Sequence, residues 1–330
     1  MVSECGGDAR IDLQKLPAGQ RVKGGNWSVF ALGRKGVQLV LGTAQLGMNY
    51  GIANAQGKPA FEEAFDIVNT AWNGGVRFFD TAQDYGESES ILGQCLREIR
   101  EKGSDDDPCI ITKLRPDVDP RNTGAVLEEL ETSLDRLGVE KLWGFMLHRE
   151  ACLDIDKREL SIAIERIKEK GKTKHFGVSV YSPERAVMAL DMDSLDMVQL
   201  PFNVFDQRAL EEGIFDFAEK KLKTVFVRSV FLQGLLLLKP DQLPSNMTFC
   251  RDELKAFRSC VEKFSISPKM AALAFVVHQA PGAFLVLGAE RAEQVRENLS
   301  LFRRAANMEI PDLMSLASQN PRVINPSIWN

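Results

Sequence analysis

Eight short apolar runs rich in β-forming residues recur along the chain, and stretches with helical spacing separate most of them. The runs begin near Val37, Val76, Cys109, Lys141, Lys174, Met197, Thr224 and Ala283. Between the first two runs, for example, Phe61, Phe65, Val68 and Trp72 lie on one face of a helix. Strands that alternate with helices form parallel sheets, because each helix returns the chain to the start of the next strand. The pattern therefore predicts an α/β fold built from βαβ units.

The number of strands distinguishes between two α/β architectures. Eight strands at this spacing predict a (β/α)8 barrel. A doubly wound sheet more typically has about five to seven strands and a glycine-rich first turn, and neither a GxGxxG nor a Walker A pattern is present. The 330 residues would also fit two domains, but no stretch has the composition of a linker. We expect one barrel domain over residues 26–330, preceded by a variable N-terminal segment over residues 1–25.

Three further segments explain why the chain is longer than a typical barrel of about 250 residues. Residues 29–41 predict a β-hairpin around residues 33–36, which would close the bottom of the barrel. Residues 232–267 form an insertion between the seventh strand and its helix. The tail after Asn307 is rich in proline and asparagine and predicts an irregular C-terminal loop.

Composition and charge narrow the class of protein. With 44% hydrophobic and 26% charged residues, the chain resembles an ordinary soluble globular protein. Its net charge of −5 argues against a nucleic-acid partner, and no apolar stretch is long enough to cross a membrane. The N-terminus lacks the apolar core of a secretory signal, and the six cysteines show no CxxC spacing. We therefore expect a cytoplasmic protein with reduced thiols and no membrane partner; the oligomeric state is left open.

Polar residues of different acid–base character end three consecutive predicted strands. Asp80 ends the second strand, and Tyr85 follows it five residues later. Lys113 ends the third strand and His148 ends the fourth. Reactive residues of a parallel barrel lie at the carboxyl ends of its strands. We expect these four side chains to converge on one pocket.

The chemistry of these four residue types is coherent. The pKa of a tyrosine is ordinarily about 10, and a nearby ammonium group lowers it. An aspartate would hold the lysine charged and in place, and a neutral histidine can hydrogen-bond a carbonyl oxygen. Such a set can exchange a proton with an oxygen atom while a carbonyl and an alcohol interconvert.

Asp80, Tyr85, Lys113 and His148, in this order and at these spacings, resemble the catalytic tetrad of the aldo-keto reductases. The resemblance covers nearly the whole chain. Residues 41–43, 177–179, 198–199, 231–235 and 288–298 are similar to the cofactor-binding segments of the family. Residues 42–51 and 227–238 are similar to a bacterial subgroup that is often tied to sugar and surface-polysaccharide metabolism.

The resemblance implies a (β/α)8 barrel that binds NADP(H), with NAD(H) as the alternative, across the carboxyl ends of its strands. Tyr85 would supply the proton, Lys113 and Asp80 would tune it, and His148 would orient the substrate. The cofactor contacts implied are Gly42, Thr43, Asp80, Ser179, Gln199, Arg228, Ser229, Leu232, Gly234, Gly288, Arg291, Gln294, Glu297 and Asn298.

Parts of the cofactor are assigned to these residues by the same resemblance. Ser179 and Gln199 would hold the nicotinamide carboxamide. Arg291 would meet the 2′-phosphate, aided by the N-terminus of the last helix, and Glu297 and Asn298 would lie near the adenine.

The chain departs from the family pattern in three places. Val180 stands where the family usually has asparagine, which removes one carboxamide contact. Arg228 stands where an aromatic side chain usually stacks on the nicotinamide, so we expect Arg228 to contact the pyrophosphate or a substrate anion. Glu290 lies near the expected phosphate pocket, and the lysine that some members carry there is absent, which weakens the preference for NADP.

Candidate substrate residues beyond Tyr85 and His148 are Tyr50, in the loop after the first strand, and Trp329, which could fold back over the pocket. His175 and His278 are expected to be structural. No H-x-x-x-H pattern or carboxylate–histidine cluster predicts a metal site.

Two functional hypotheses follow. In the first, the protein is an oxidoreductase that interconverts a small aldehyde, ketone or sugar with its alcohol by hydride transfer, with Tyr85 as proton donor. In the alternative it is a cofactor-binding regulatory subunit with little turnover, like the potassium-channel β subunits. A metal-dependent barrel hydrolase is disfavoured because the chain has only three histidines.

Overall fold

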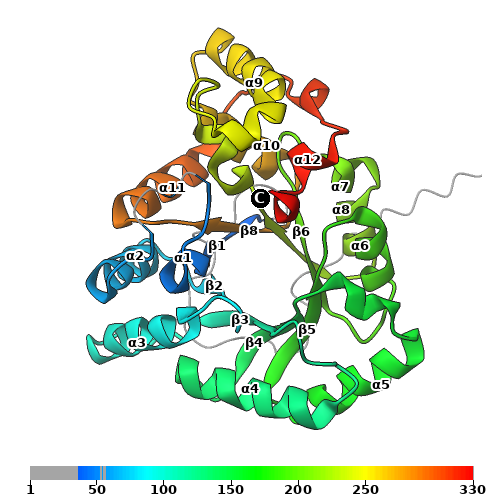
Figure 1. The fold of residues 1–330 in the computed structure, drawn as a ribbon. Helices are drawn as coiled ribbons and strands as arrows, with labels where there is room; N and C mark the ends of the chain where they lie inside the picture. The colour runs from blue at the N-terminus through cyan, green and yellow to red at the C-terminus, as the bar shows by residue number, and fades with distance from the viewer. Residues whose placement is uncertain (1–35, 53, 55–56, 330) are drawn as a thin grey trace, which may run out of the picture.

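The computed structural model describes residues 36–52, 54 and 57–329. Its parallel strands close into a barrel in chain order, with the first strand hydrogen-bonded to both the second and the eighth (Figure 1). The strands are β1 (Gln38–Gly42), β2 (Phe78–Asp80), β3 (Cys109–Leu114), β4 (Leu142–Leu147), β5 (Thr173–Ser179), β6 (Met197–Pro201), β7 (Thr224–Arg228) and β8 (Phe284–Gly288). The predicted fold class is confirmed, and each strand begins within two residues of its predicted start.

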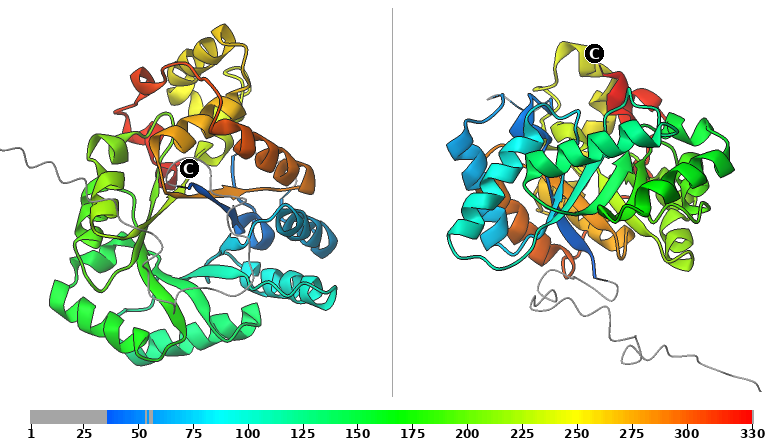
Figure 2. Two further views of the ribbon diagram at one scale, coloured as in Figure 1. Left: turned by 180° about the vertical axis from the view of Figure 1, so that it is seen from behind. Right: turned by 90° about the horizontal axis from the view of Figure 1, so that it is seen from below.

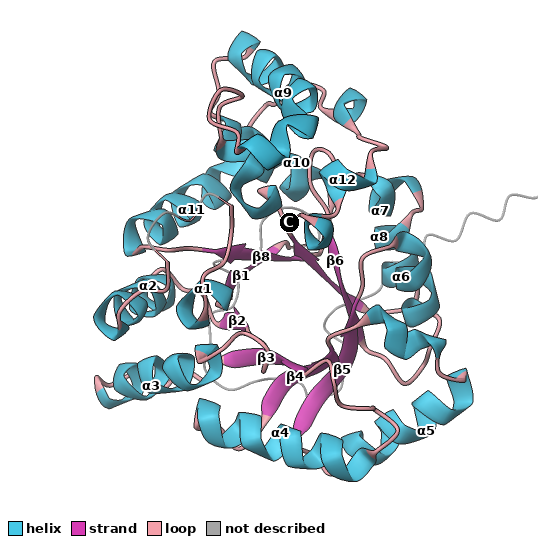
Figure 3. Ribbon diagram, viewed as in Figure 1, coloured by secondary structure: helices cyan, strands magenta, loops and turns pink. Residues whose placement is uncertain are grey.

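A helix follows each strand, and these helices form a ring outside the barrel (Figure 3). They are α2 (Phe61–Asn73), α3 (Ser88–Glu101), α4 (Thr123–Leu137), α5 (Lys157–Lys168), α6 (Pro183–Leu190), α8 (Ile214–Lys220), α10 (Pro268–Gln279) and α11 (Ala292–Ala305). Each amphipathic helix buries its apolar face; in α4 this face includes Val126, Leu130 and Leu134. Serines cap the starts of α6 and α10, with proline at the first helical position.

The interior of the barrel is filled by side chains and is not a channel. Val40, Ile111, Met146, Met197 and Phe226 form a buried cluster there. Aromatic rings from β2, β4, β7 and β8 pack edge to face against one another around this cluster. Because the interior is packed, a ligand cannot bind inside the barrel, and we expect its site at the carboxyl ends of the strands.

The insertion and the C-terminal tail pack together at one end of the barrel. The insertion contains η4 (Leu232–Leu237), η5 (Ser245–Cys250) and α9 (Arg251–Lys263), and the tail contains η6 (Met314–Leu316), α12 (Pro321–Ile324) and η7 (Pro326–Ile328). Residues of α12 contact η5, and residues of η6 contact α9. The Gln207 amide in the loop after β6 donates to the Leu313 carbonyl oxygen at 2.9 Å. Figure 2 shows the C-terminal end of the chain at this end of the barrel.

The predicted N-terminal hairpin needs one correction. Residues 1–35, which include the variable segment and most of the hairpin, lie outside the described residues. Residues 38–41, the expected second arm, belong to β1, which pairs in parallel with β2 and β8. Leu39, Val40 and Leu41 are all buried, as is usual for a barrel strand that is covered on both faces.

Two short helices lie in loops that connect barrel elements: α1 (Ala44–Gly47) after β1 and α7 (Arg208–Glu211) after β6. In the described part of the chain, no helix combines the length and the apolarity needed to cross a bilayer.

Candidate active site

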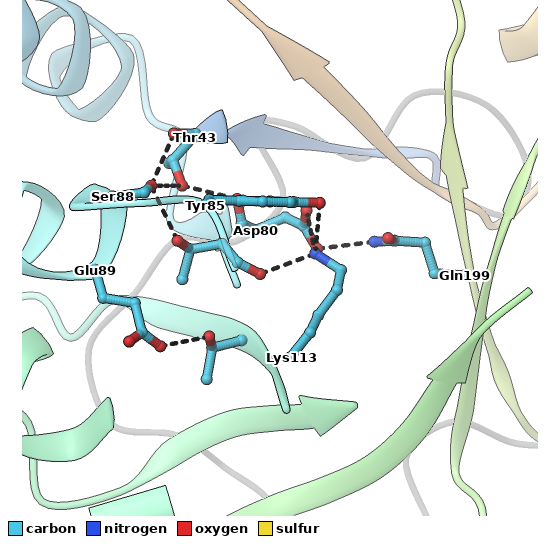
Figure 4. A network of polar contacts seen from close by, with 9 residues as sticks. Thr43, Asp80, Tyr85, Ser88, Glu89, Lys113 and Gln199 are labelled. Atoms are coloured by element: carbon cyan, nitrogen blue, oxygen red, sulfur yellow. Dashed lines mark hydrogen bonds and ion pairs between the residues drawn. The ribbon is translucent and has the colours of Figure 1, made fainter. Parts of the chain in front are cut away.

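A buried ion pair lies at the ends of two neighbouring strands (Figure 4). The Lys113 Nζ atom is 2.9 and 2.8 Å from the two carboxylate oxygens of Asp80. It also donates to the Thr81 carbonyl oxygen at 2.8 Å. Lys113 is fully buried and Asp80 is 4% exposed, so the pair depends on these hydrogen bonds to offset the loss of hydration. The structure thus brings two of the predicted catalytic residues together.

Tyr85 lies in the loop between β2 and α3, beside this ion pair. Its hydroxyl oxygen is 3.5 Å from Lys113 Nζ. Burial, and then the charge of Asp80, raise the pKa of Tyr85 well above its usual value. The sequence predicted a lowered pKa from the lysine; here the Asp80 carboxylate compensates the charge of Lys113. Tyr85 is accordingly a neutral phenol with a proton to donate.

His148 follows β4, and its ring meets the ring of Tyr85 edge to face with the centroids 5.7 Å apart. Burial, followed by the charges of Lys113 and Arg228, lowers the pKa of His148 to about 3. The imidazole is therefore neutral at pH 7. Its buried Nδ1 atom has no hydrogen-bond partner within the described residues. A neutral ring beside a phenol can contact a substrate oxygen without adding a charge.

Close backbone packing holds Tyr85 in place. A Cβ atom on Gly47, at the end of α1, would lie 1.8 Å from the Tyr85 carbonyl oxygen. Only glycine permits this approach. The Ser88 hydroxyl donates to the Thr43 carbonyl oxygen at 2.7 Å and accepts from the Thr81 hydroxyl at 3.0 Å (Figure 4). The sequence analysis missed Gly47 and Ser88, because no spacing pattern indicates a contact between these loops.

A cleft with a volume of about 200 Å³ begins at this group and runs toward the N-terminus of α11. Many of the predicted cofactor residues line it: Gly42, Thr43, Asp80, Gln199, Arg228, Ser229, Gly234, Gly288, Gln294 and Asn298. Tyr85 and the predicted substrate residue Tyr50 line it as well. Burial raises the pKa of Tyr50 to about 12, so its hydroxyl is also neutral at pH 7.

Other predicted residues do not line the cleft, among them Lys113 and His148, which contact Tyr85. Ser179 is buried at the end of β5, and Leu232 is fully buried in η4. Arg291 and Glu297 are exposed at the start of α11. The indole of Trp329 donates to the Arg322 carbonyl oxygen within the tail.

Gln199, expected to hold a carboxamide, donates from its amide to Asp80 Oδ1 at 2.8 Å (Figure 4). This bond links β6 to β2, on well-separated parts of the barrel. The Asp80 carboxylate is thus held by Gln199 as well as by Lys113, and this second contact fixes the orientation in which Asp80 binds Lys113.

Lys269 is a cleft residue that the sequence analysis did not find. It stands at the start of α10, lines the cleft and forms an ion pair with Glu297. The chain therefore does have a lysine at this end of the cleft, supplied by a different helix from the one where it was sought. Glu290 also lines the cleft, and burial raises its pKa.

The residues of the cleft fit an elongated polar molecule such as a dinucleotide. Gly42 and Gly288 line the cleft, and a Cβ atom would lie 2.9 Å from Val286 on the first or 2.5 Å from the Gln45 amide on the second. At the far end, Asn298 is 5% exposed and its Oδ1 atom has no partner within the described residues. Buried polar atoms are rarely left unpaired, so Asn298 Oδ1 is suited to accept from a ligand.

Val180 and Arg228, two positions at which the chain differs from the family pattern, contact each other in the structure. The Arg228 Nη2 atom donates to the Val180 carbonyl oxygen at 3.1 Å. The guanidinium lies over the ring of Tyr181, 4.3 Å from its centroid.

The fold and these side chains define a class of protein: a parallel (β/α)8 barrel with a buried lysine–aspartate pair, a tyrosine and a histidine together at the carboxyl ends of its strands. The sequence model of the Aldo/keto reductase family matches residues 38–316, and the chain belongs to this family. It is an oxidoreductase.

Two relatives carry names of oxidoreductases, and a solved structure shares the fold. The "uncharacterized oxidoreductase YqkF" of Bacillus subtilis (strain 168) is 26% identical over 280 residues, covering 78% of this chain and 89% of the relative. An "NADH-specific methylglyoxal reductase" of Escherichia coli (strain K12) is 25% identical over 280 residues, covering 75% and 83%. The holo form of aldo-keto reductase AKR11C1 from Bacillus halodurans shares the fold with a TM-score of 0.67 at 22% identity, covering 88% of this chain and 96% of that one.

Proposed function

We propose that the protein interconverts a small aldehyde, ketone or sugar with its alcohol, using NADP(H), with Tyr85 as proton donor. The observation that carries this proposal is the neutral phenol of Tyr85 at one end of the cleft, beside a buried Lys113–Asp80 pair and the ring of His148, whose Nδ1 atom has no partner within the described residues. The methylglyoxal reductase among the relatives acts on a small carbonyl compound by its name, which supports this substrate class.

The roles of the chain's own residues follow from their positions. The nicotinamide, when bound, supplies the hydride for the carbonyl carbon. Tyr85 donates its proton to the carbonyl oxygen, and the resulting phenolate is stabilised by the ammonium of Lys113. Asp80 and Gln199 keep Lys113 in position. His148 orients the substrate oxygen as a neutral hydrogen-bonding group.

The far end of the cleft would hold the remainder of the cofactor. Gly234, Gly288, Gln294 and Asn298 line it, and the start of α11 adds a favourable dipole for a phosphate. Lys269 beside this helix supports NADP(H), whereas Glu290 and Glu297 favour NAD(H). We propose NADP(H) as the preferred cofactor, with Lys269 as the main cation at this end of the cleft.

The Tyr85→Phe variant tests the proposal. We expect turnover with small aldehydes, measured as the oxidation of NADPH or NADH, to fall by about 10²- to 10⁴-fold, because the proton donor is lost. The dissociation constant of the cofactor, followed by fluorescence titration, should change little, since the phenylalanine ring keeps the same shape.

Turnover of Tyr85→Phe equal to that of the unaltered protein would contradict the assignment. Tight cofactor binding without turnover on a broad panel of aldehydes, ketones and sugars would instead favour the alternative, a cofactor-binding regulatory subunit.

A further inference from the structure

Arg228, at the end of β7, is a cation of the cleft whose charge no carboxylate compensates. Its contacts are the Val180 carbonyl oxygen at 3.1 Å, the Ser229 hydroxyl at 3.5 Å and the ring of Tyr181. Within the described residues, no carboxylate oxygen lies within 4.0 Å of its guanidinium. In contrast, Arg185 and Arg208 both form ion pairs with aspartates.

In the described part of the chain, two of the other three charged residues that line the cleft form ion pairs, and the third, Glu290, is an acid and supplies no positive charge. Asp80 is paired with Lys113, and Lys269 is paired with Glu297 at the far end. The unmatched positive charge of Arg228 lies close enough to act on the catalytic end of the cleft. Burial raises the pKa of Tyr50 and Tyr85 and lowers that of His148, and the charge of Arg228 opposes the first two changes and adds to the third.

The guanidinium is also held in a fixed orientation. Stacking on Tyr181 and the bond to Val180 restrict the side chain. These contacts and the one to Ser229 use two of the five N–H donors of an arginine. The remaining donors form a planar fork that matches a carboxylate or a phosphate.

We propose that Arg228 binds an anionic group on the substrate, so that the protein acts preferentially on carbonyl compounds that also carry a carboxylate or a phosphate. This inference rests on the proposed function. It assigns Arg228 to the substrate and not to the cofactor phosphates, because Arg228 lines the same end of the cleft as Asp80, Tyr85 and Gln199.

Two matched pairs of substrates test the inference. Succinic semialdehyde and butanal differ in a carboxylate, and glyceraldehyde 3-phosphate and glyceraldehyde differ in a phosphate. We expect kcat/KM to be higher for the anionic member of at least one pair, and the pair that shows it identifies the anion. In Arg228→Gln this ratio should fall by about 10- to 100-fold, because a charge-assisted bidentate contact is lost. Arg228→Lys keeps the charge without the fork and should give an intermediate ratio.

Arg115→Gln is the matched control. It makes the same change in net charge, but Arg115 is exposed, pairs with Asp117 and Glu129, and does not line the cleft. Its substrate ratio should equal that of the unaltered protein.

Two results would overturn the inference while leaving the proposed function intact. One is carbonyl reduction with the same anionic-to-neutral ratio in Arg228→Gln as in the unaltered protein. The other is a loss of NADPH affinity in Arg228→Gln that accounts for the whole decrease in kcat/KM.

If no carbonyl compound is reduced, the proposed function fails. Calorimetric binding of 4-hydroxybutyrate to the cofactor-loaded protein still tests the role of Arg228. Equal affinity in the unaltered protein and in Arg228→Gln, or no binding to either, would then contradict the inference.

Discussion

The ammonium group of Lys113 is fully buried, and its position depends on the carboxylate of Asp80. Asp80 contributes both oxygens to it, and the Thr81 carbonyl oxygen accepts a third hydrogen bond. Burial lowers the pKa of Lys113, and the charge of Asp80 acts in the opposite direction. Removing either partner therefore leaves an uncompensated charge in a medium of low polarity.

Asp80→Asn should reduce the free energy of unfolding by about 3–5 kcal/mol, because Lys113 then remains buried without a counter-charge. Urea unfolding followed by circular dichroism measures the change. The double variant Asp80→Asn with Lys113→Met removes both charges and should recover part of the loss. An Asp80→Asn protein as stable as the unaltered one would show that the pair is not held as described.

At the scale of elements, the site depends on the contact between α1 and the loop that carries Tyr85. The Gly47 backbone lies against the Tyr85 carbonyl oxygen, and the Ser88 hydroxyl links the start of α3 to the end of β1. The buried carboxylate of Glu89 then ties α3 to β3 through the Thr112 hydroxyl at 2.6 Å (Figure 4). The position of the phenol is therefore set by three elements that meet through backbone and hydroxyl groups.

Gly47→Ala should destabilise the protein and displace Tyr85, because the new methyl group would lie 1.8 Å from the Tyr85 carbonyl oxygen. We expect a loss of about 1–3 kcal/mol, as for other overpacked sites, and a lower kcat. Gly124→Ala is the matched control. Gly124 lies in α4, where a Cβ atom would meet Asn122 Oδ1 at an ordinary contact distance of 3.5 Å. Alanine there should be neutral or stabilising by about 0.5–1 kcal/mol. Equal stability and kcat in the two variants would contradict this account.

The same contacts show what the sequence could and could not predict. The strands were predictable because each is a short apolar run, and the tetrad was predictable because polar residues end three of these runs. The bond between Gln199 and Asp80 joins residues 119 positions apart, and Lys269 reaches the cleft from α10. Spacing along the chain predicts the barrel, but it does not encode which side chains from distant elements meet once the barrel is closed.

At the scale of the whole molecule, a net charge of −5 is compatible with an anionic ligand because the cations of the cleft are local. Arg228 lies at one end and Lys269 at the other. The insertion supplies η4 to the cleft, through Gln233 and Leu237, and the tail packs against the insertion. The insertion thus contributes to one wall of the cleft and carries the tail on its other contacts, so cofactor binding should stabilise the whole fold.

NADP⁺ should stabilise the protein against urea more than NAD⁺ does at the same concentration. A ligand at about 100 times its dissociation constant adds about 2.7 kcal/mol to the free energy of unfolding. Lys269→Gln should reduce the effect of NADP⁺ and change that of NAD⁺ much less, because it removes a cation near the expected 2′-phosphate and leaves the Glu297 carboxylate unpaired. Lys172→Gln is the control, since Lys172 pairs with Glu131 at 3.3 Å and does not line the cleft. If NAD⁺ stabilises the unaltered protein more than NADP⁺, the proposed cofactor preference is wrong, and the charges of Glu290 and Glu297 outweigh that of Lys269.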